Sequence, residues 1–235
     1  MSQTIAASET MLGRAPLGRG RALVVRLALT AGVLVVWFWT QSMIGARRLD
    51  GGAIHDRLHT GLALGNSYLH AHLAMANALL IVSSGMVDML GIFLLAQWIF
   101  GGSLRPFLAL VIVLGLRQLM QWLVALPAPP DAIWHYPGVP SLLVTYGVSN
   151  DYFFSGHTAI AVLGAAELAR LERRWLLLAG IAVVVFEVFV VLVLRAHYTM
   201  DVFTGAITAL YAAHLADSLS CRIDRSRLRP NAGDS

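Results

Sequence analysis

RWLLLAGIAVVVFEVFVVLVLRAHYTMD, residues 174–201, joins a long apolar run to a short run of polar and ionisable residues. A helix needs about 20 apolar residues to cross the hydrocarbon core of a bilayer. Residues 175–195 supply such a run, with Glu187 as an internal acidic residue. Directly after the run come His197 and Asp201. The stretch therefore predicts a membrane-spanning helix that ends in reactive side chains at one face of the membrane.

The composition of the whole chain agrees with a membrane protein. The 235 residues are 57% hydrophobic and only 13% charged, whereas a soluble domain carries roughly 25% charged residues. The net charge is +4, and all 17 basic residues are arginines. The arginines flank apolar runs, which is typical of topology signals rather than of nucleic-acid binding. The chain has a single cysteine, Cys221, which excludes an intramolecular disulfide, and we expect no cysteine-based metal site.

Further apolar runs predict an all-α, polytopic membrane protein, a bundle of six transmembrane helices. The predicted spans are 22–45, 72–100, 104–126, 155–171, 175–195 and 200–218. Residues 1–21 form a predicted cytoplasmic N-terminal tail, 22–220 the catalytic membrane domain, and 221–235 a cytoplasmic C-terminal tail. The mixed segment 46–71 is expected at the membrane interface, and the proline-rich residues between the third and fourth spans are expected to be non-helical.

Arginine positions predict how the chain is oriented. Eleven arginines lie in the two tails and in the loops expected on the same side as the tails, and four lie in the opposite loops. The positive-inside rule then places both termini in the cytoplasm of a bacterial-type inner (plasma) membrane. The proline-rich loop and the turn at 195–200 face outward, so we expect the reactive residues on the outer side.

One group of reactive residues is the motif RAHYTMD, residues 195–201. His197 and Asp201 are four residues apart, which on a helix places them on one face. An aspartate beside a histidine fixes the tautomer and stabilises the imidazolium ion. This is the arrangement that an activated histidine nucleophile needs.

A second group is the motif DYFFSGHT, residues 151–158, just before the predicted fourth span. Ser155 is a suitable N-cap, and Gly156 allows another group to approach the backbone closely. His157 would then stand at a helix N-terminus, where unpaired N–H groups and the helix dipole favour an anion. The motif therefore predicts a phosphate site with His157 next to the leaving oxygen.

Other polar residues allow more than one interpretation. A metal site would use the same two histidines and Asp201, but without a further acidic cluster the ligand set is thin, so neither metal nor cofactor is expected. Three ionisable residues fall inside predicted spans, Asp88, Arg117 and Glu187. Arg117 either approaches the site or forms a structural ion pair with one of the two acids. The remaining histidines are interpreted as interface anchors or structural residues: His55, His59, His70, His72, His135 and His214.

Taken together, these motifs resemble the phosphatidic acid phosphatase type 2 superfamily, and more closely its sphingomyelin synthase branch. The resemblance covers about residues 72–218 and rests on LRQLMQWLVALPAP (116–129), NDYFFSGHT (150–158) and AHYTMDV (196–202). The resemblance implies that His197 attacks phosphorus and forms a phosphohistidine intermediate. It further implies that Asp201 orients His197, and that His157 protonates the leaving alcohol and deprotonates the acceptor.

The resemblance also implies substrates and a wider site. The expected partners are membrane lipids, with a phospholipid donor and a ceramide or diacylglycerol-type acceptor, and no metal is required. Catalysis is assigned to His157, His197 and Asp201. Substrate binding is assigned to Arg117, Asp151, Tyr152, Ser155, Gly156, Arg195 and Tyr198. The sequence makes no prediction of the oligomeric state.

Departures from the phosphatase pattern favour the synthase branch. Val190 and Val191 stand where the phosphatases carry a Ser-Arg pair, and the lysine-containing phosphatase motif is missing. Arg195 stands where the synthase branch carries a histidine, and its guanidinium could bind a phosphate oxygen. The leading prediction is a phosphotransferase that moves a headgroup between lipids, like sphingomyelin or ceramide phosphoethanolamine synthases. Two alternatives stay open: hydrolysis at the same site, as in a lipid phosphatase or phospholipase C-type enzyme, and a non-catalytic transporter or scaffold.

Overall fold

The structure is a computed structural model that describes residues 54–101, 103–124, 126–144, 146 and 152–227, together with the single positions 21, 24, 28 and 35. It divides the chain into two units, residues 1–55 and 56–235. The first predicted span, 22–45, falls outside the described residues except for isolated positions, so it stays a prediction. The description below concerns the second unit.

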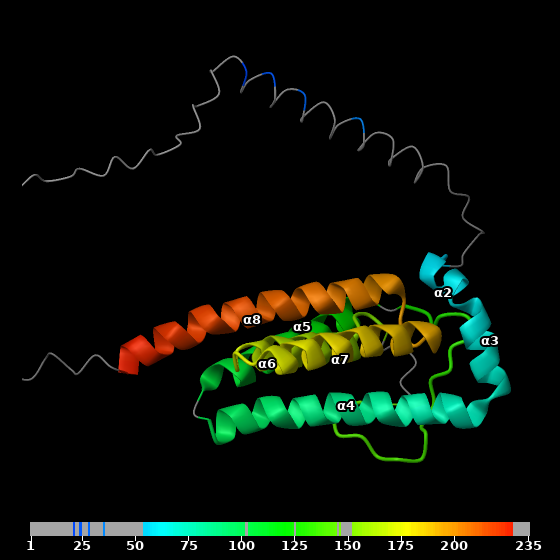
Figure 1. Cartoon of the computed structure of the whole chain (residues 1–235), viewed down its shortest axis with the longest axis horizontal. Coiled ribbons are helices and arrows are strands. Elements are labelled where there is room, and N and C mark those ends of the chain that lie inside the picture. Colours follow the sequence, from blue (N-terminus) through cyan, green and yellow to red (C-terminus); the bar gives the residue numbers. More distant parts are fainter. Residues whose placement is uncertain are drawn as a thin grey trace, which may run out of the picture. The chain divides into compact units, whose positions relative to one another are not determined.

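The second unit is a bundle of antiparallel helices in which successive long helices alternate in direction (Figure 1). The long helices are α4 (Leu73–Ile99), α5 (Leu104–Leu123), α6 (Gly156–Ala169), α7 (Arg174–Val193) and α8 (Thr199–Arg227). Two short helices, α2 (Arg57–Gly61) and α3 (Ala63–Ala71), lie at the end of the bundle where α4 and α8 begin and α7 ends. We call this the site end, because both reactive motifs lie there, and we call the opposite end the far end.

The described residues confirm the predicted all-α class, and the predicted second to fifth spans match α4 to α7 closely. Among the described residues, three helices are long and apolar enough to cross a membrane: α4, α5 over Leu104–Gln121, and α7. Helix α6 has 14 residues and is roughly 21 Å long, which is shorter than the hydrocarbon core of about 30 Å. Helix α8 continues beyond the predicted end at 218 to Arg227. The count of six spans therefore stays a prediction.

Helix α6 occupies the centre of the bundle and contacts α4, α5, α7 and α8. Its central position explains why most of its residues are buried and why its sequence, GHTAIAVLGAAELA, is rich in small side chains. Small side chains let neighbouring helices approach closely, which is how packing is gained where the surroundings are as apolar as the protein. The largest core cluster joins α6 to Val87 of α4, Val113 of α5 and Ala209 of α8.

The proline-rich connection between α5 and α6 is non-helical at all of its described positions, as predicted. Asp88, in the middle of α4, holds part of this loop. Its carboxylate accepts hydrogen bonds from the hydroxyl of Ser141 at 3.0 and 2.9 Å and from the backbone N–H groups of Leu142 and Leu143 at 2.8 and 2.9 Å. A charge inside a predicted span thus serves to fold the loop back against the bundle.

Candidate active site

The first reactive motif forms the N-terminus of α6, as the sequence predicted. Ser155 is the N-cap residue, and its hydroxyl accepts a hydrogen bond from the backbone N–H of Thr158 at 3.3 Å. This cap satisfies one of the N–H groups that every helix start leaves without an intrahelical partner. His157 then lies in the first turn of α6, with only 5% of its surface exposed.

The second reactive motif forms the turn between α7 and α8. Helix α8 begins at Thr199, so His197 precedes the helix, and the expectation that His197 and Asp201 share one helix is wrong. The imidazole Nδ1 atom of His197 lies 2.8 Å from the backbone oxygen of Tyr152. A carbonyl oxygen can only accept, so Nδ1 carries the proton, and in the neutral ring Nε2 carries the lone pair.

Asp201 lies close to His197 but bonds elsewhere. Its Oδ2 atom is 3.9 Å from Nδ1 of His197 and accepts a hydrogen bond from the backbone N–H of Tyr198 at 2.9 Å. Asp201 is fully buried, and its Oδ1 atom has no hydrogen-bond partner among the described residues. The carbonyl of Tyr152, rather than the carboxylate, therefore fixes the ring of His197, while Asp201 adds a nearby negative charge.

Two backbone contacts tie the motifs together. The N–H of Ser155 donates to the carbonyl of Asp201 at 3.1 Å. Gly205 lies one helical turn after Asp201 on α8 and packs directly against Ser155. A Cβ atom at position 205 would lie 2.5 Å from the carbonyl oxygen of Ser155. A larger residue at 205 would push α6 away from α8. The positions of His157 and His197 relative to each other therefore depend on α8.

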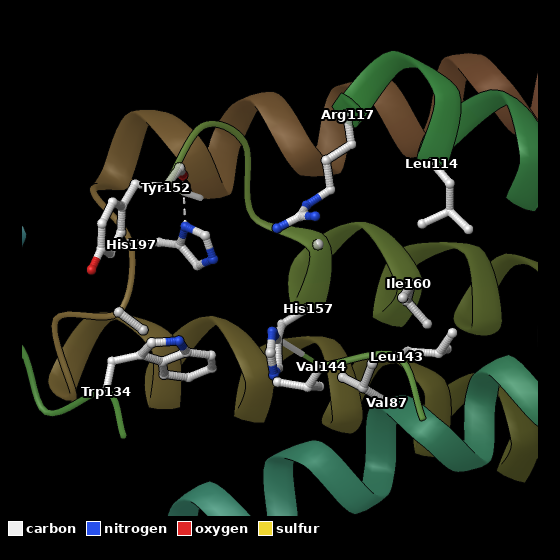
Figure 2. A pocket seen from close by; sticks show the side chains of 12 residues that line it. Val87, Leu114, Arg117, Trp134, Leu143, Val144, Tyr152, His157, Ile160 and His197 are labelled. Atoms are coloured by element: carbon white, nitrogen blue, oxygen red, sulfur yellow. Dashed lines mark hydrogen bonds between the residues drawn. The ribbon is translucent and has the colours of Figure 1, made fainter. Parts of the chain in front are cut away.

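Both histidines line one cavity. Figure 2 shows their rings and the guanidinium of Arg117 converging on the same space. Polar groups supply one part of the wall, and apolar side chains from α4, α5, α6, the connecting loop and the α7–α8 turn supply the rest. The lining residues are Val87, Leu114, Arg117, Trp134, Leu143, Val144, Tyr152, Gly156, His157, Ile160, Ala196 and His197.

Within this cavity, His157 has a hydrogen-bonding atom that the protein leaves unsatisfied. Nε2 of His157 is buried and has no hydrogen-bond partner among the described residues. Trp134 packs edge-on against the imidazole, with ring centroids 5.4 Å apart. Burying a polar atom without a partner costs free energy. Such an atom in a cavity wall is suited to a ligand that completes its hydrogen bonding.

Arg117 reaches the site from α5, as one of the two sequence interpretations proposed. Its Nε atom donates to the carbonyl of Phe154 at 3.4 Å. A Cβ atom at position 156 would lie 3.1 Å from that Nε atom, so Gly156 makes room for the guanidinium beside the helix start. A guanidinium next to a helix N-terminus forms an electropositive wall that favours an oxyanion such as phosphate.

Not every residue expected to bind substrate lines the cavity. Asp151 lies outside the described residues. Ser155 is fully buried, and its hydroxyl accepts from Thr158. The guanidinium of Arg195 donates to the carboxylate of Asp131 at 2.8 Å and to a neighbouring carbonyl at 2.9 Å, so it does not line the cavity.

Tyr198 was also expected to bind substrate, but it faces the protein. Its hydroxyl donates to the carbonyl of Pro127 at 3.2 Å. Burial raises the pKa of the Tyr198 hydroxyl, and the nearby charge of Asp201 raises it further, which keeps the hydroxyl protonated as a donor. Tyr198 therefore holds the proline-rich loop against the second motif instead of lining the cavity.

Sequence reasoning missed the role of His59. It was interpreted as an interface anchor, yet it is buried, and its Nε2 atom lies 2.9 Å from the carbonyl oxygen of His197. No spacing rule connects residues that are 138 positions apart in the chain. Across the described residues, no group of three or more His, Cys, Asp or Glu side chains lies close enough to hold a metal ion.

Comparisons with known proteins show the family of the chain. The family model described as AtPDCT1/2 matches residues 55–218, a range that contains both motifs. Phosphatidylcholine:diacylglycerol cholinephosphotransferase 1 of Arabidopsis thaliana is 25% identical over 197 residues, which cover 83% of this chain. The chain spans 61% of the length of that relative. No solved structure matches the chain.

Proposed function

The chain belongs to the AtPDCT1/2 family, and we propose that it is a membrane phosphotransferase that moves a phospho-headgroup from a phospholipid to a lipid alcohol. One observation carries the proposal. Nδ1 of His197 is held by the carbonyl of Tyr152, so the basic Nε2 atom is available in a cavity that also contains the unsatisfied Nε2 of His157 and the guanidinium of Arg117. A nucleophile, an acid/base and an oxyanion-binding cation meet there.

In the first step, Nε2 of His197 attacks the phosphorus atom of the donor phospholipid. The bond between phosphorus and the glycerol oxygen breaks, and a P–N bond forms. The leaving oxygen takes a proton from Nε2 of protonated His157, which gives a neutral lipid alcohol. Arg117 and the N-terminus of α6 stabilise the charge that develops on the other phosphate oxygens.

In the second step, the hydroxyl of an acceptor lipid gives its proton to Nε2 of His157, and its oxygen attacks phosphorus. The P–N bond breaks, and His197 regains its lone pair. During the time that His197 carries the phosphoryl group, its ring is positively charged. The buried carboxylate of Asp201, 3.9 Å from Nδ1, stabilises that charge.

The identity of the acceptor decides between transfer and hydrolysis. The name of the Arabidopsis thaliana relative specifies diacylglycerol, which favours diacylglycerol over ceramide as the acceptor here. The apolar part of the cavity wall, with Val87, Leu114 and Ile160, suits an acyl-bearing alcohol better than water. If water attacked instead, the same two steps would release a free phosphorylated headgroup.

The test is an isotope-transfer assay. Purified protein in mixed micelles receives phosphatidylcholine with a labelled headgroup, together with diacylglycerol or ceramide of distinguishable acyl composition, and the lipid products are analysed by mass spectrometry. The expected product is labelled phosphatidylcholine that carries the acyl chains of the added diacylglycerol. Label found only in free phosphocholine, whatever alcohol is added, would establish a hydrolase. Absence of any product that depends on His197 would overturn catalysis at this site.

The proposal includes an orientation, with both termini in the cytoplasm and the cavity near the outer face of a bacterial-type inner membrane. It rests on the distribution of arginines along the sequence. Cysteine labelling in a Cys221→Ser background tests it. A cysteine in place of Trp134 is expected to react with an impermeant reagent added from outside, and one in place of Arg173 only after permeabilisation. The reverse pattern would contradict the orientation.

A further inference from the structure

The turn that carries His197 is braced by a segment far away in sequence. His59, on α2, is 6% exposed, and its Nε2 atom lies 2.9 Å from the carbonyl oxygen of His197. Because the carbonyl only accepts, His59 is the donor. The ring of His59 also stacks on Tyr198, the next residue after the nucleophile, with centroids 5.7 Å apart. One side chain thus contacts two successive residues of the turn.

Asp56 contacts the end of the same turn, at Thr199. Its carboxylate accepts from the backbone N–H of Thr199 at 2.6 Å and from the hydroxyl of Thr199 at 2.7 Å. It also caps α2, accepting from the N–H groups of Leu58 at 2.9 Å and His59 at 3.4 Å. A single carboxylate therefore joins the first residue of α8 to the first turn of α2, where both helix dipoles favour a negative charge.

These hydrogen bonds also set the charge of Asp56. Burial raises the pKa of its carboxyl group, but the hydrogen bonds from Thr199 and the nearby imidazole of His59 outweigh burial, so the pKa lies below its ordinary value of 3.8. Asp56 is consequently ionised at neutral pH. Its hydrogen bonds to α8 are charge-assisted, and such bonds are stronger than those between neutral groups.

The contacts made by Asp56 and His59 matter because His197 lies in a turn rather than in a helix. The backbone of His197 has one further hydrogen bond, from its N–H to the carbonyl of Val191 at a long 3.4 Å. Its ring has the bond to the carbonyl of Tyr152. A catalytic group has to stay within about 0.5 Å of its productive position. Contacts to the carbonyl of His197 and to both following residues are suited to hold it there.

We propose that Asp56 and His59 are positioning residues for the nucleophile, which lock the turn between α7 and α8 so that Nε2 of His197 points at the phosphorus atom. The inference rests on the proposed function of His197. Residues of the segment that contains α2 would then position the active site, although neither Asp56 nor His59 lines the cavity.

Paired substitutions of His59 test the inference. His59→Gln keeps an N–H donor at the length of Nε2, whereas His59→Phe keeps a stacking ring but has no donor. His72→Phe is the matched control, because the imidazole of His72 bonds within its own segment, to the carbonyl of Tyr68 at 2.9 Å. We expect His59→Phe to lower kcat by about 10²-fold, the scale of a misplaced reacting group, with little change in KM. His59→Gln is expected to recover most of kcat, and His72→Phe to behave as the wild type.

A second pair separates positioning from loss of folding. Thr199→Ser keeps the hydroxyl that donates to Asp56, and Thr199→Val removes it but keeps the shape. The thermal unfolding midpoint is measured for every variant. We expect Thr199→Val to lower kcat more than Thr199→Ser at equal thermal stability.

The outcomes separate this inference from the proposed function. If the wild type transfers the headgroup while His59→Phe keeps its kcat, or if His59→Gln is no better than His59→Phe, the positioning role is wrong and the proposed function stands. If His59→Phe raises KM at constant kcat, the positioning role is also wrong. A wild type that transfers no headgroup would overturn the proposed function and this inference together.

Discussion

The two ends of the bundle both carry charged and polar side chains from α5, α6 and α8, but they treat them differently. At the far end, Arg105 donates to both carboxylate oxygens of Glu167, at 3.1 and 2.7 Å. Its Nε atom also lies 3.5 Å from Asp217. Arg170 completes the cluster, with Glu167 at 3.6 Å and a hydrogen bond to Asp217. Each charge of this cluster thus has a partner of opposite sign.

At the site end, three buried polar atoms are left without a partner among the described residues: Nε2 of His157, Oδ1 of Asp201 and Nε of Arg195. The protein positions these groups but does not complete their hydrogen bonding. Burial of an unsatisfied polar group is costly, and a ligand that completes the bonding recovers that cost. The two ends therefore differ in how completely their polar groups are hydrogen-bonded, rather than in how many polar groups they carry.

Removing either histidine at the site end should have the largest effect, a loss of activity of at least 10²–10⁴-fold, typical of losing an acid/base group. The two losses should differ in kind. His157→Ala should still form a phosphohistidine from a substrate with a good leaving group, such as a nitrophenyl ester, because no proton donor is needed. His197→Ala should form none. Rapid quench at alkaline pH followed by peptide mapping makes the measurement, and phosphate found on His157 would reverse the two roles.

Substituting Gly205, which joins α8 to the site, should affect stability and activity together. In Gly205→Ala the new Cβ would meet the carbonyl oxygen of Ser155 at 2.5 Å, so the start of α6 has to move. Overpacking of this kind costs typically 1–3 kcal/mol, and kcat should fall because His157 moves with Ser155. The control is Gly115→Ala on α5, where nothing lies within 4 Å of the added atom. Equal kcat values for the two variants would show that the contact does not position the site.

Breaking the far-end cluster should cost stability and spare catalysis. Arg105→Met leaves buried Glu167 without its nearest partner, which should lower the free energy of unfolding by about 1–3 kcal/mol. The double variant Arg105→Met/Glu167→Met should recover much of that loss, because no charge is left uncompensated. Thermal unfolding and kcat of the folded protein are measured in parallel. A large fall in kcat at unchanged stability would contradict the division between the two ends.

Arg195 should show the smallest effect, although it belongs to a reactive motif. Its guanidinium bonds to the carboxylate of Asp131 and to the carbonyl of Pro130 and does not line the cavity. Arg195→Gln should therefore change kcat by less than about threefold. Arg117→Gln, from the cavity wall, serves as the comparison and should lose far more activity. A larger loss of activity for Arg195→Gln than for Arg117→Gln would show that Arg195 binds the phosphate.

Local features of the sequence determined much of this protein. Long apolar runs predicted α4, α5 and α7, because a helix of that length is what such a run forms in a membrane. Ser155 predicted the start of α6, because a serine hydroxyl satisfies the N–H groups of the next turn. The two motifs also identified His157 and His197, which the fold brings to one cavity. The six-span count and the orientation stay predictions.

Which groups complete the site depends on contacts between segments that are distant in the sequence. The partner of His197 is a backbone carbonyl, that of Tyr152, and every residue carries a carbonyl, so no side-chain pattern could single it out. His59 meets His197 across 138 positions of chain, through packing of α2 against the end of the bundle. Arg195, the first residue of the second motif, has a positive φ of 53° in the turn and bonds to Asp131 instead of lining the cavity. Sequence encodes local periodicity and capping, whereas the direction of a side chain in a turn depends on contacts with distant segments.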